Sequence, residues 1–239
     1  MKTHLQIYLL EIFLVFFLAL GCSPLSAKSP EEIISKYKKA IVMVDMSDGH
    51  CTGFAVADEI IITAAHCFNG PDPRATVIAD DGSKFPANLL AINSKTDVAI
   101  LFARGFGGVY FELWDEAIDG EIPQGLPIMS LGYPGYYQSR FTFEVSYVKS
   151  LILVGGEQQI MAKDLIYPGE SGGPVVSLTN GKVIGLSSAI LAQTNMLSNG
   201  RTYGYTIGIA SSSTSILRLM SHAASPNYHL GLVAPIYGL

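Results

Sequence analysis

The feature that most constrains this chain is a series of short β-branched or aromatic segments, each bounded by turn residues, that begins at Ala40. Many short strands at such intervals predict an all-β sandwich or barrel. Helical spacing of apolar residues dominates only one later segment, STSILRLMSHA (213–223). The predicted strands are 40–46, 52–57, 60–63, 74–79, 84–92, 97–103, 127–133, 140–148, 151–156, 158–164, 173–178, 182–188 and 203–209.

A stretch rich in glycine and acidic residues, 106–125, divides these strands into two groups and is the candidate boundary between two barrels. With 239 residues, 49% of them hydrophobic, the chain can form one large all-β domain or two small barrels. The domain to which these strands belong is predicted at 40–222. Its parts are barrel one at about 40–112, barrel two at about 120–210 and a C-terminal helix at about 211–222, and a tail, 223–239, follows.

Residues 1–21 have the pattern of an export signal, because Lys2 precedes an apolar run whose unbroken part, Ile12–Leu20, is nine residues long. That run is too short for a transmembrane helix, which needs about 20 apolar residues. The segment ends in LALGCSPLSAKSP, which resembles a bacterial lipobox in which Cys22 becomes a lipidated N-terminus. Ordinary signal cleavage is the alternative. The protein is expected to be exported, as a membrane-anchored lipoprotein or as a periplasmic or secreted protein.

Residues 22–39 are predicted to form a linker and a short helix. The linker is rich in Ser and Pro, and the helix has its own start signal. Ser29 is the expected N-cap, Pro30 suits the first helical position and Glu32 completes a capping box.

The chain has three cysteines. In an oxidising compartment Cys51 and Cys67 could pair across the strand–turn–strand between them. Cys22 is then left over, and lipidation would give this unpaired thiol a use.

The charge and the histidine spacing exclude several classes of ligand. The net charge is −5, the pI is near 5.5 and no run of Lys or Arg forms a basic stripe, so nucleic acid is not an expected partner. The five histidines are scattered and show no H-E-x-x-H spacing. We therefore expect no metal and no cofactor.

One histidine, His66, stands just before the second cysteine of CTGFAVADEIIITAAHC (51–67). The three small residues before it let the chain turn sharply out of the buried strand IIIT and hold the histidine at a fixed place. A general base needs such fixing, because its nitrogen must lie within about 3 Å of the proton it removes.

Two further segments make His66 more than a loop histidine. Asp97 opens the strand DVAILFA, and Ser171 lies in the glycine-rich turn YPGESGGPVV. Each residue alone would be explained as a turn residue, but the order His, Asp, Ser is one of the known orders of a catalytic triad. The prediction is that Ser171 is the nucleophile, His66 its base and Asp97 the residue that orients the imidazole.

The segments TAAHC, DVAIL and GESGGP resemble the active-site blocks of chymotrypsin-fold, trypsin-like serine proteases, nearest the HtrA-type bacterial branch. The resemblance extends from about residue 40 to about 220 and includes LGYPG, AKDLIYPGESGGPVV and YGYTIGIASSSTSIL. It implies two six-stranded Greek-key β-barrels packed together, a short C-terminal helix, and an exported serine endopeptidase that forms an acyl-enzyme. It also implies the Cys51–Cys67 disulfide, since the cysteine after the catalytic histidine pairs in this family with one sixteen residues earlier.

The family also assigns the oxyanion donors and the substrate pocket. The donors are the amides of the glycine two residues before the nucleophile and of the nucleophile itself, here Gly169 and Ser171. The residue six before the nucleophile, here Leu165, lies at the base of the specificity pocket.

The strand after the serine loop is the edge that pairs with substrate in this family, and here it would contribute Ser188, Ala189 and Ile190. Leu165 and Ile190 would make the pocket apolar and shallow. The predicted preference is therefore Val, Ala, Ile or Leu before the cut bond, with Arg and Lys disfavoured.

Two other classes of protein fit this sequence less well. A non-catalytic binding protein with a protease fold predicts the loss of a triad member or an oxyanion glycine, and none is lost. An α/β-hydrolase shares G-x-S-x-G but needs a helix straight after the serine, which GGPVVSL cannot begin. HtrA-type proteins usually add a PDZ domain, and the tail before Leu239 is too short for one. We expect a bare protease domain that acts on polypeptides and is compatible with a monomer, with the oligomeric state left open.

Overall fold

The computed structural model describes residues 27–47, 49–135, 140–163, 169–196 and 202–225. For 163, 192–196 and 202–206, which lie in strands, it describes the backbone alone. The predicted export signal, Cys22, Asp164 and Leu165 therefore lie outside the described residues.

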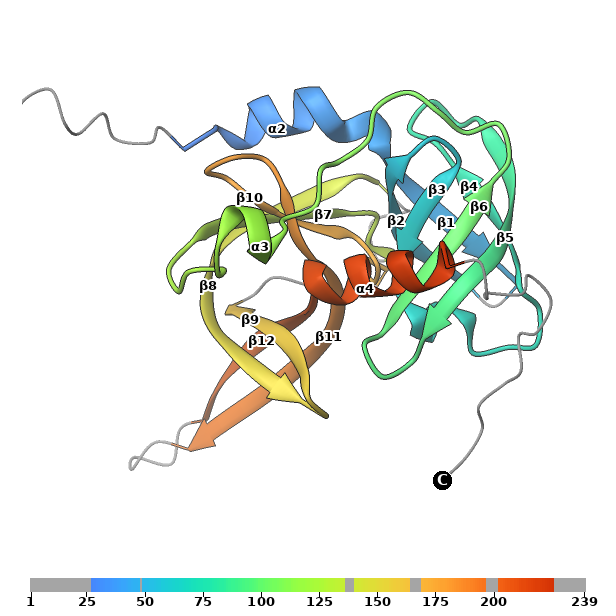
Figure 1. Cartoon of the computed structure of the whole chain (residues 1–239). Helices are drawn as coiled ribbons and strands as arrows, with labels where there is room; N and C mark the ends of the chain where they lie inside the picture. The colour runs from blue at the N-terminus through green and yellow to red at the C-terminus, as the bar shows by residue number, and fades with distance from the viewer. Residues whose placement is uncertain (1–26, 48, 136–139, 164–168, 197–201, 226–239) are drawn as a thin grey trace, which may run out of the picture.

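Within these described residues, twelve strands form two closed antiparallel barrels of six strands each (Figure 1). The first barrel has the order β1-β2-β3-β6-β5-β4 and the second has the order β10-β11-β12-β9-β8-β7. The predicted fold class is thus confirmed. The strands of barrel one are β1 (Ile41–Met46), β2 (Gly49–Ala57), β3 (Ile60–Thr63), β4 (Arg74–Ile78), β5 (Lys84–Asn93) and β6 (Val98–Ala103). Those of barrel two are β7 (Pro127–Gly132), β8 (Thr142–Val154), β9 (Glu157–Lys163), β10 (Pro174–Ser177), β11 (Val183–Met196) and β12 (Thr202–Ser212).

The sequence predicted one strand too many in barrel two. The segments 140–148 and 151–156, predicted as separate strands, both fall largely in one strand, β8 (Thr142–Val154). This strand pairs with β7 through its first half and with β9 through its second. The register shifts between Val148 and Ser150, so a β-bulge lets one strand continue around the corner of the barrel.

The N-terminal helix α2 (Pro30–Tyr37) begins as predicted. Ser29 accepts a hydrogen bond from Glu32 N, and the Glu32 side chain accepts one from Ser29 N. A short 3₁₀-helix, η1 (Lys38–Ala40), leads from α2 into β1. Ile33 and Tyr37 are buried, and the Tyr37 ring stacks on Phe111 with the centroids 4.4 Å apart. The helix is thus part of the hydrophobic core.

The C-terminal helix α4 (Ser213–Ala223) crosses the front of both barrels in Figure 1 and contacts β5 and β6 of the first as well as β9, β11 and β12 of the second. Ile216 and Leu219 on this helix are buried in the main core cluster. Burial of this apolar stripe holds the two barrels together.

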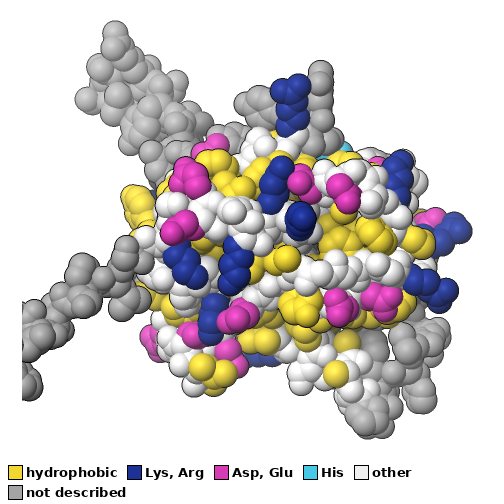
Figure 2. Space-filling view, turned by 90° about the horizontal axis from the view of Figure 1, so that it is seen from above, with side chains coloured by type: hydrophobic (Ala, Val, Ile, Leu, Met, Phe, Trp, Pro, Cys, Tyr) yellow, Lys and Arg dark blue, Asp and Glu magenta, His cyan; other side chains and the backbone are white. Residues whose placement is uncertain are grey.

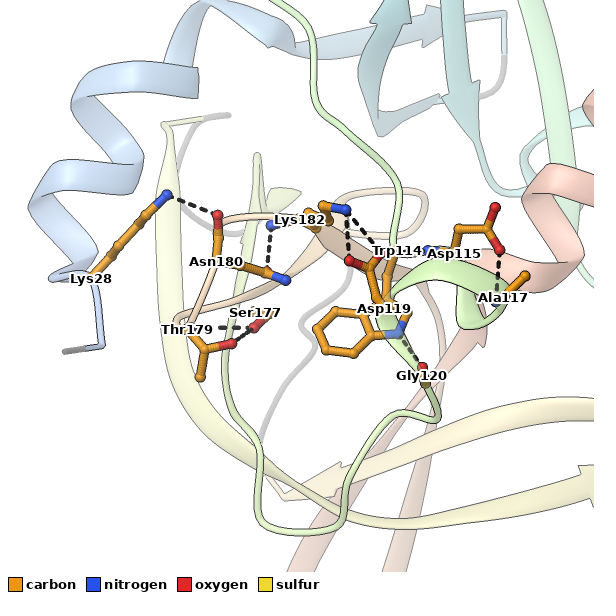
Figure 3. Close-up of polar contacts among 10 residues, drawn as sticks. All are labelled: Lys28, Trp114, Asp115, Ala117, Asp119, Gly120, Ser177, Thr179, Asn180 and Lys182. Carbon is orange, nitrogen blue, oxygen red and sulfur yellow. Dashed lines mark hydrogen bonds and ion pairs between the residues drawn. The ribbon is translucent and has the colours of Figure 1, made fainter. Parts of the chain in front are cut away.

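The connection between the barrels contains a short helix that the sequence did not predict, α3 (Glu116–Asp119). Figure 3 shows how polar contacts fix it: the Lys182 ammonium pairs with Asp119 at 2.7 Å, and the Trp114 indole N–H donates to Gly120 O at 2.8 Å. In the same view the Lys28 ammonium donates to Asn180 O at 2.8 Å. The N-terminal segment and the interbarrel connection are therefore both held by the turn between β10 and β11.

On the face shown in Figure 2, Lys and Arg side chains lie interspersed with Asp and Glu, and apolar side chains fill the spaces between them. Among the described residues, no helix has both the length and the apolar character needed to span a membrane.

Candidate active site

His66 lies in a 3₁₀-helix, η2 (Ala65–Phe68), that follows the buried strand β3. Ala64 and Ala65 are buried, so the small side chains before the histidine allow the chain to turn against the barrel wall. The His66 side chain keeps 42% of its surface exposed. The local sequence thus presents the imidazole to solvent from a rigid base.

The Cys51–Cys67 disulfide is present in the structure and joins β2 to η2 through two residues that are 16 positions apart. A disulfide that closes a loop of this length lowers the conformational entropy of the unfolded chain and so raises the free energy of unfolding by about 3 kcal/mol. The two sulfur atoms and a ring nitrogen of His66 lie within 4.8 Å of one another. The bond therefore fixes the position of η2 directly beside the imidazole.

Asp97 binds His66 twice. Its Oδ1 accepts a hydrogen bond from the His66 backbone N–H at 2.8 Å, and its Oδ2 lies 2.8 Å from His66 Nδ1. Asp97 has a left-handed backbone (φ +54°), which is uncommon for a residue other than glycine, and its carbonyl accepts from Ala65 N. Both the backbone and the side chain of Asp97 are thus directed at the turn that carries His66.

The carboxylate of Asp97 raises the pKa of His66 above its ordinary value of 6.5, mainly through the hydrogen bond to Nδ1, while burial of the imidazole opposes the shift. With Nδ1 engaged by Asp97, the other ring nitrogen of neutral His66 is an acceptor. The pair therefore has the electronic arrangement of an oriented general base.

Ser188 also binds Asp97, with its hydroxyl donating to Oδ2 at 2.5 Å. The sequence placed Ser188 only among the substrate-pairing residues and gave no sign of this contact. A register shift between Ser187 and Ala189 in β11 leaves Ser188 out of the pairing with β12. This bulge lets the side chain of Ser188, in barrel two, reach Asp97, which precedes β6 of barrel one.

Ser171 lies in the turn before β10, and its side chain is half-buried. The loop that carries it is held by contacts with barrel one. Thr52 N donates to Ser171 O at 2.9 Å. A Cβ at the next residue, Gly172, would clash with Thr52 O and Thr63 Oγ1 and come 2.7 Å from Ala64 N. Glycine at 172 thus allows the serine loop to lie against the strand end that leads to His66.

Position 169 requires glycine for two reasons. Its φ is +96°, and a Cβ would come within 2.8 Å of Tyr133 O. Within the described residues the amides of Gly169 and Ser171 donate to no acceptor. These are the two amides that the family resemblance assigned to the oxyanion hole.

Thr52 contacts the serine loop, which the sequence did not predict. Its hydroxyl donates to Gly169 O and accepts from Tyr133 N, both at 2.9 Å, while its carbonyl accepts from Thr63 Oγ1 at 2.7 Å. It is fully buried. The only sequence signal was its place next to Cys51, and that did not reveal a contact with a loop more than a hundred positions away.

The expected substrate edge is partly described. Ala189 and Ile190 pair with β12 on one side, and both are exposed. The other edge of β11 is paired with β10 only as far as Leu186, and Ser187 completes its bonds with Gly172 and Gly173. Among the described strands the segment from Ser188 to Ile190 therefore has one unpaired edge.

A double six-stranded barrel with a His–Asp pair on one barrel and a glycine-flanked serine on the other has the architecture of a chymotrypsin-like serine hydrolase. The chain belongs to the trypsin-like peptidase domain family, which it matches over residues 51–186.

The curated relatives are HtrA-type proteins. A probable periplasmic serine endoprotease DegP-like from Chlamydia pneumoniae is 29% identical over 145 residues, which cover 59% of this chain and 29% of that protein. The serine protease HTRA1 of Xenopus tropicalis is 28% identical over 144 residues, covering 57% of this chain and 30% of HTRA1. The chain thus spans about three tenths of the length of these relatives.

Solved structures share the fold. The protease Rv3671c of M. tuberculosis H37Rv, as an inactive Ser343Ala mutant, superposes with a TM-score of 0.64 at 19% identity, over 85% of this chain and 98% of that one. The HtrA-type protease AlgW with a tripeptide has a TM-score of 0.64 at 22% identity, over 81% of this chain and 62% of that one. The sequence-based assignment to the trypsin-like, HtrA-type group is confirmed.

Proposed function

We propose that this protein is an exported serine endopeptidase that hydrolyses peptide bonds through His66, Asp97 and Ser171. The observation that carries the proposal is the pair of 2.8 Å bonds from Asp97 to His66, on a turn against which the loop of Ser171 is packed. The family and the names of the relatives support the same reaction class.

Ser171 Oγ would attack the scissile carbonyl while His66 takes its proton, and His66 would then return that proton to the leaving amine. Asp97 fixes the imidazole in the tautomer that accepts from the serine and stabilises the imidazolium that forms. Ser188 holds the Asp97 carboxylate in place for this task. Water then hydrolyses the acyl-enzyme by the same route.

The amides of Gly169 and Ser171 would stabilise the oxyanion of each tetrahedral intermediate. Donors that are fixed before the reaction lower its barrier because they need not reorganise, and each is worth about 3 kcal/mol. Thr52 fixes the Gly169 carbonyl and thereby the peptide plane that continues toward Ser171.

Substrate would bind in extended form along the unpaired edge of Ser188–Ile190 as an added strand. The exposed Ile190 would narrow the pocket, and Leu165, which lies outside the described residues, would form its base. We therefore propose a preference for Val, Ala, Ile or Leu before the cut bond.

Export is proposed from the signal pattern in residues 1–21, together with the periplasmic relatives. Lipidation of Cys22 would anchor the domain to a membrane. Mass spectrometry of the mature protein tests this: an acylated Cys22 N-terminus is expected, and a mature N-terminus after Cys22 would contradict the anchor and leave the protease proposal intact.

The activity is tested by labelling with a fluorophosphonate and by hydrolysis of an unstructured protein. Ser171→Ala and His66→Ala should abolish nearly all turnover, whereas Ser83→Ala, in an exposed turn after Gly82, should retain full activity. A Ser171→Ala protein that still cleaves would refute the nucleophile. A folded wild-type protein that neither labels nor cleaves any peptide would favour a non-catalytic binding role.

Cleavage of a peptide library tests the pocket. An aliphatic preference is expected for the wild type, and Ile190→Gly should admit larger side chains. A dominant Arg or Lys before the cut would show that Asp164, and not Leu165, reaches the base of the pocket.

A further inference from the structure

Three potential metal ligands meet beside the proposed active site. Cys51 Sγ, Cys67 Sγ and a ring nitrogen of His66 lie within 4.8 Å of one another. In the structure the two sulfur atoms are joined in a disulfide, and a disulfide sulfur is a poor ligand because metal sites use the thiolate. In the oxidised protein these residues therefore cannot bind a metal together.

We propose that reduction of the Cys51–Cys67 disulfide creates a zinc site from two thiolates and His66, and that zinc binding there switches the protease off. A dithiol reductant supplies the two electrons: its own thiols become a disulfide as Cys51 and Cys67 become thiols. Zinc then binds both sulfurs as thiolates, with release of their two protons. While the S–S bond is intact, it prevents zinc from binding at this site.

The geometry fits zinc with small side-chain movements. Once the S–S bond is broken, the sulfurs separate to van der Waals contact, and two thiolates on one tetrahedral zinc lie about 3.8 Å apart with Zn–S near 2.3 Å. Because all three donor atoms already lie within 4.8 Å of one another, such an arrangement needs only a small separation of the two sulfurs. Two Cys and one His leave a fourth position for water, as in zinc sites with three protein ligands.

Asp97 would help to hold the metal. Histidine ligands of zinc usually donate their second ring N–H to a carboxylate, which fixes the tautomer and increases the basicity of the ligating nitrogen. His66 Nδ1 already lies 2.8 Å from Asp97 Oδ2, so Nε2 is the nitrogen left for the metal. The same contact that prepares His66 as a base therefore prepares it as a ligand.

The site is accessible and its occupation has a direct consequence. The His66 side chain is 42% exposed and Cys67 is partly exposed, so an ion can reach them from solvent. An Nε2 lone pair bound to zinc cannot accept the proton of Ser171. This inhibition rests on the proposed function, but metal binding does not require catalysis.

The binding test uses the Ser171→Ala protein, which cannot degrade itself, and cobalt(II) as a spectroscopic probe for zinc. After reduction with a phosphine, which offers no thiols, we expect one cobalt per chain with thiolate-to-cobalt charge-transfer absorption that zinc displaces. The oxidised protein should show none of this absorption. Cys51→Ser with Cys67→Ser, and separately His66→Ala, should weaken the site at least about 100-fold, because even the loss of a ligand's partner costs up to about 100-fold.

Folding is followed by near-ultraviolet circular dichroism in the same samples. A native spectrum for the reduced, metal-bound protein is expected. A reduced protein that binds no cobalt, that binds it equally without His66, or that is unfolded with and without metal would overturn the proposal.

Activity is measured separately with the wild-type chain. Zinc should inhibit the reduced enzyme reversibly at concentrations that leave the oxidised enzyme active, and a chelator should restore turnover. Equal inhibition of both forms would refute the claim that the disulfide prevents zinc binding. If the oxidised enzyme itself has no activity, the proposed function fails while the cobalt result still decides the metal site.

Discussion

Replacing Thr52 by valine tests whether barrel one holds the serine loop in place. Valine has nearly the shape of threonine, so it preserves packing and removes only the hydroxyl. That hydroxyl joins two groups of barrel two, Gly169 O and Tyr133 N, each at 2.9 Å. Both groups lose their partner in the variant.

The cost follows from the burial of those two groups. Tyr133 is 7% exposed, so its N–H would lack any partner, at about 1–3 kcal/mol. Gly169 is half-buried and water can replace part of its bond, so we assign it about 1 kcal/mol. The sum of about 2–4 kcal/mol should lower the urea midpoint by about 1–2 M. Displacement of the peptide after Gly169 should also lower kcat by about 10–100-fold, up to the loss of one oxyanion donor.

Urea unfolding and cleavage of a peptide substrate measure the two effects. Thr52→Ser is the matched control, because it keeps the hydroxyl and loses one methyl group, at about 1 kcal/mol. The control should keep most of the activity. If Thr52→Val is as stable and as active as Thr52→Ser, the hydroxyl does not position the loop and the argument is wrong.

Four further outcomes are expected. Because Asp97 holds the pKa of His66 above 6.5, the acid limb of kcat/KM should have its midpoint above pH 6.5, and histidine NMR should show this pKa falling in Asp97→Asn; an unchanged value would contradict the pairing. The same raised pKa means that the stabilisation from this pair is complete below pH 6.5 and is lost as the pH rises through the folded value, which thermal unfolding across this range checks. Ser188→Ala removes a hydrogen bond to the charged Asp97 carboxylate, so it should lower kcat/KM about 10-fold and the free energy of unfolding by about 1.5 kcal/mol; full activity would show that Asp97 needs no such support. Ser29→Ala removes the helix cap bonded to Glu32 and should cost about 1 kcal/mol of stability without changing kcat, and an equally stable variant would show that α2 needs no cap.

Much of the fold and the positions of the three proposed catalytic residues could be predicted from the sequence, because these features depend on local patterns. Strand periodicity and turn residues predicted most of the strands of both barrels, although the predicted strand 182–188 covers only the first part of β11, and the capping box at Ser29 predicted the start of α2. The blocks around His66, Asp97 and Ser171 were recognisable because each needs particular residues within a few positions: small ones before the histidine and glycines around the serine.

Other features depended on how the barrels pack. Segments 140–148 and 151–156 became one strand because a bulge continues the pairing from β7 to β9, and no local residue announces that choice. The pocket base at Leu165 remains a prediction.

The contacts that fix the site were decided by the tertiary structure alone. Thr52 bonds a glycine 117 positions later, and Ser188 bonds Asp97 from 91 positions away. Serine and threonine occur throughout this chain, and nothing in the sequence around Thr52 or Ser188 distinguishes them from the serines and threonines in turns. Their roles arise because the two closed barrels bring strands that are distant in the sequence close together, so that each hydroxyl meets a group of the other barrel.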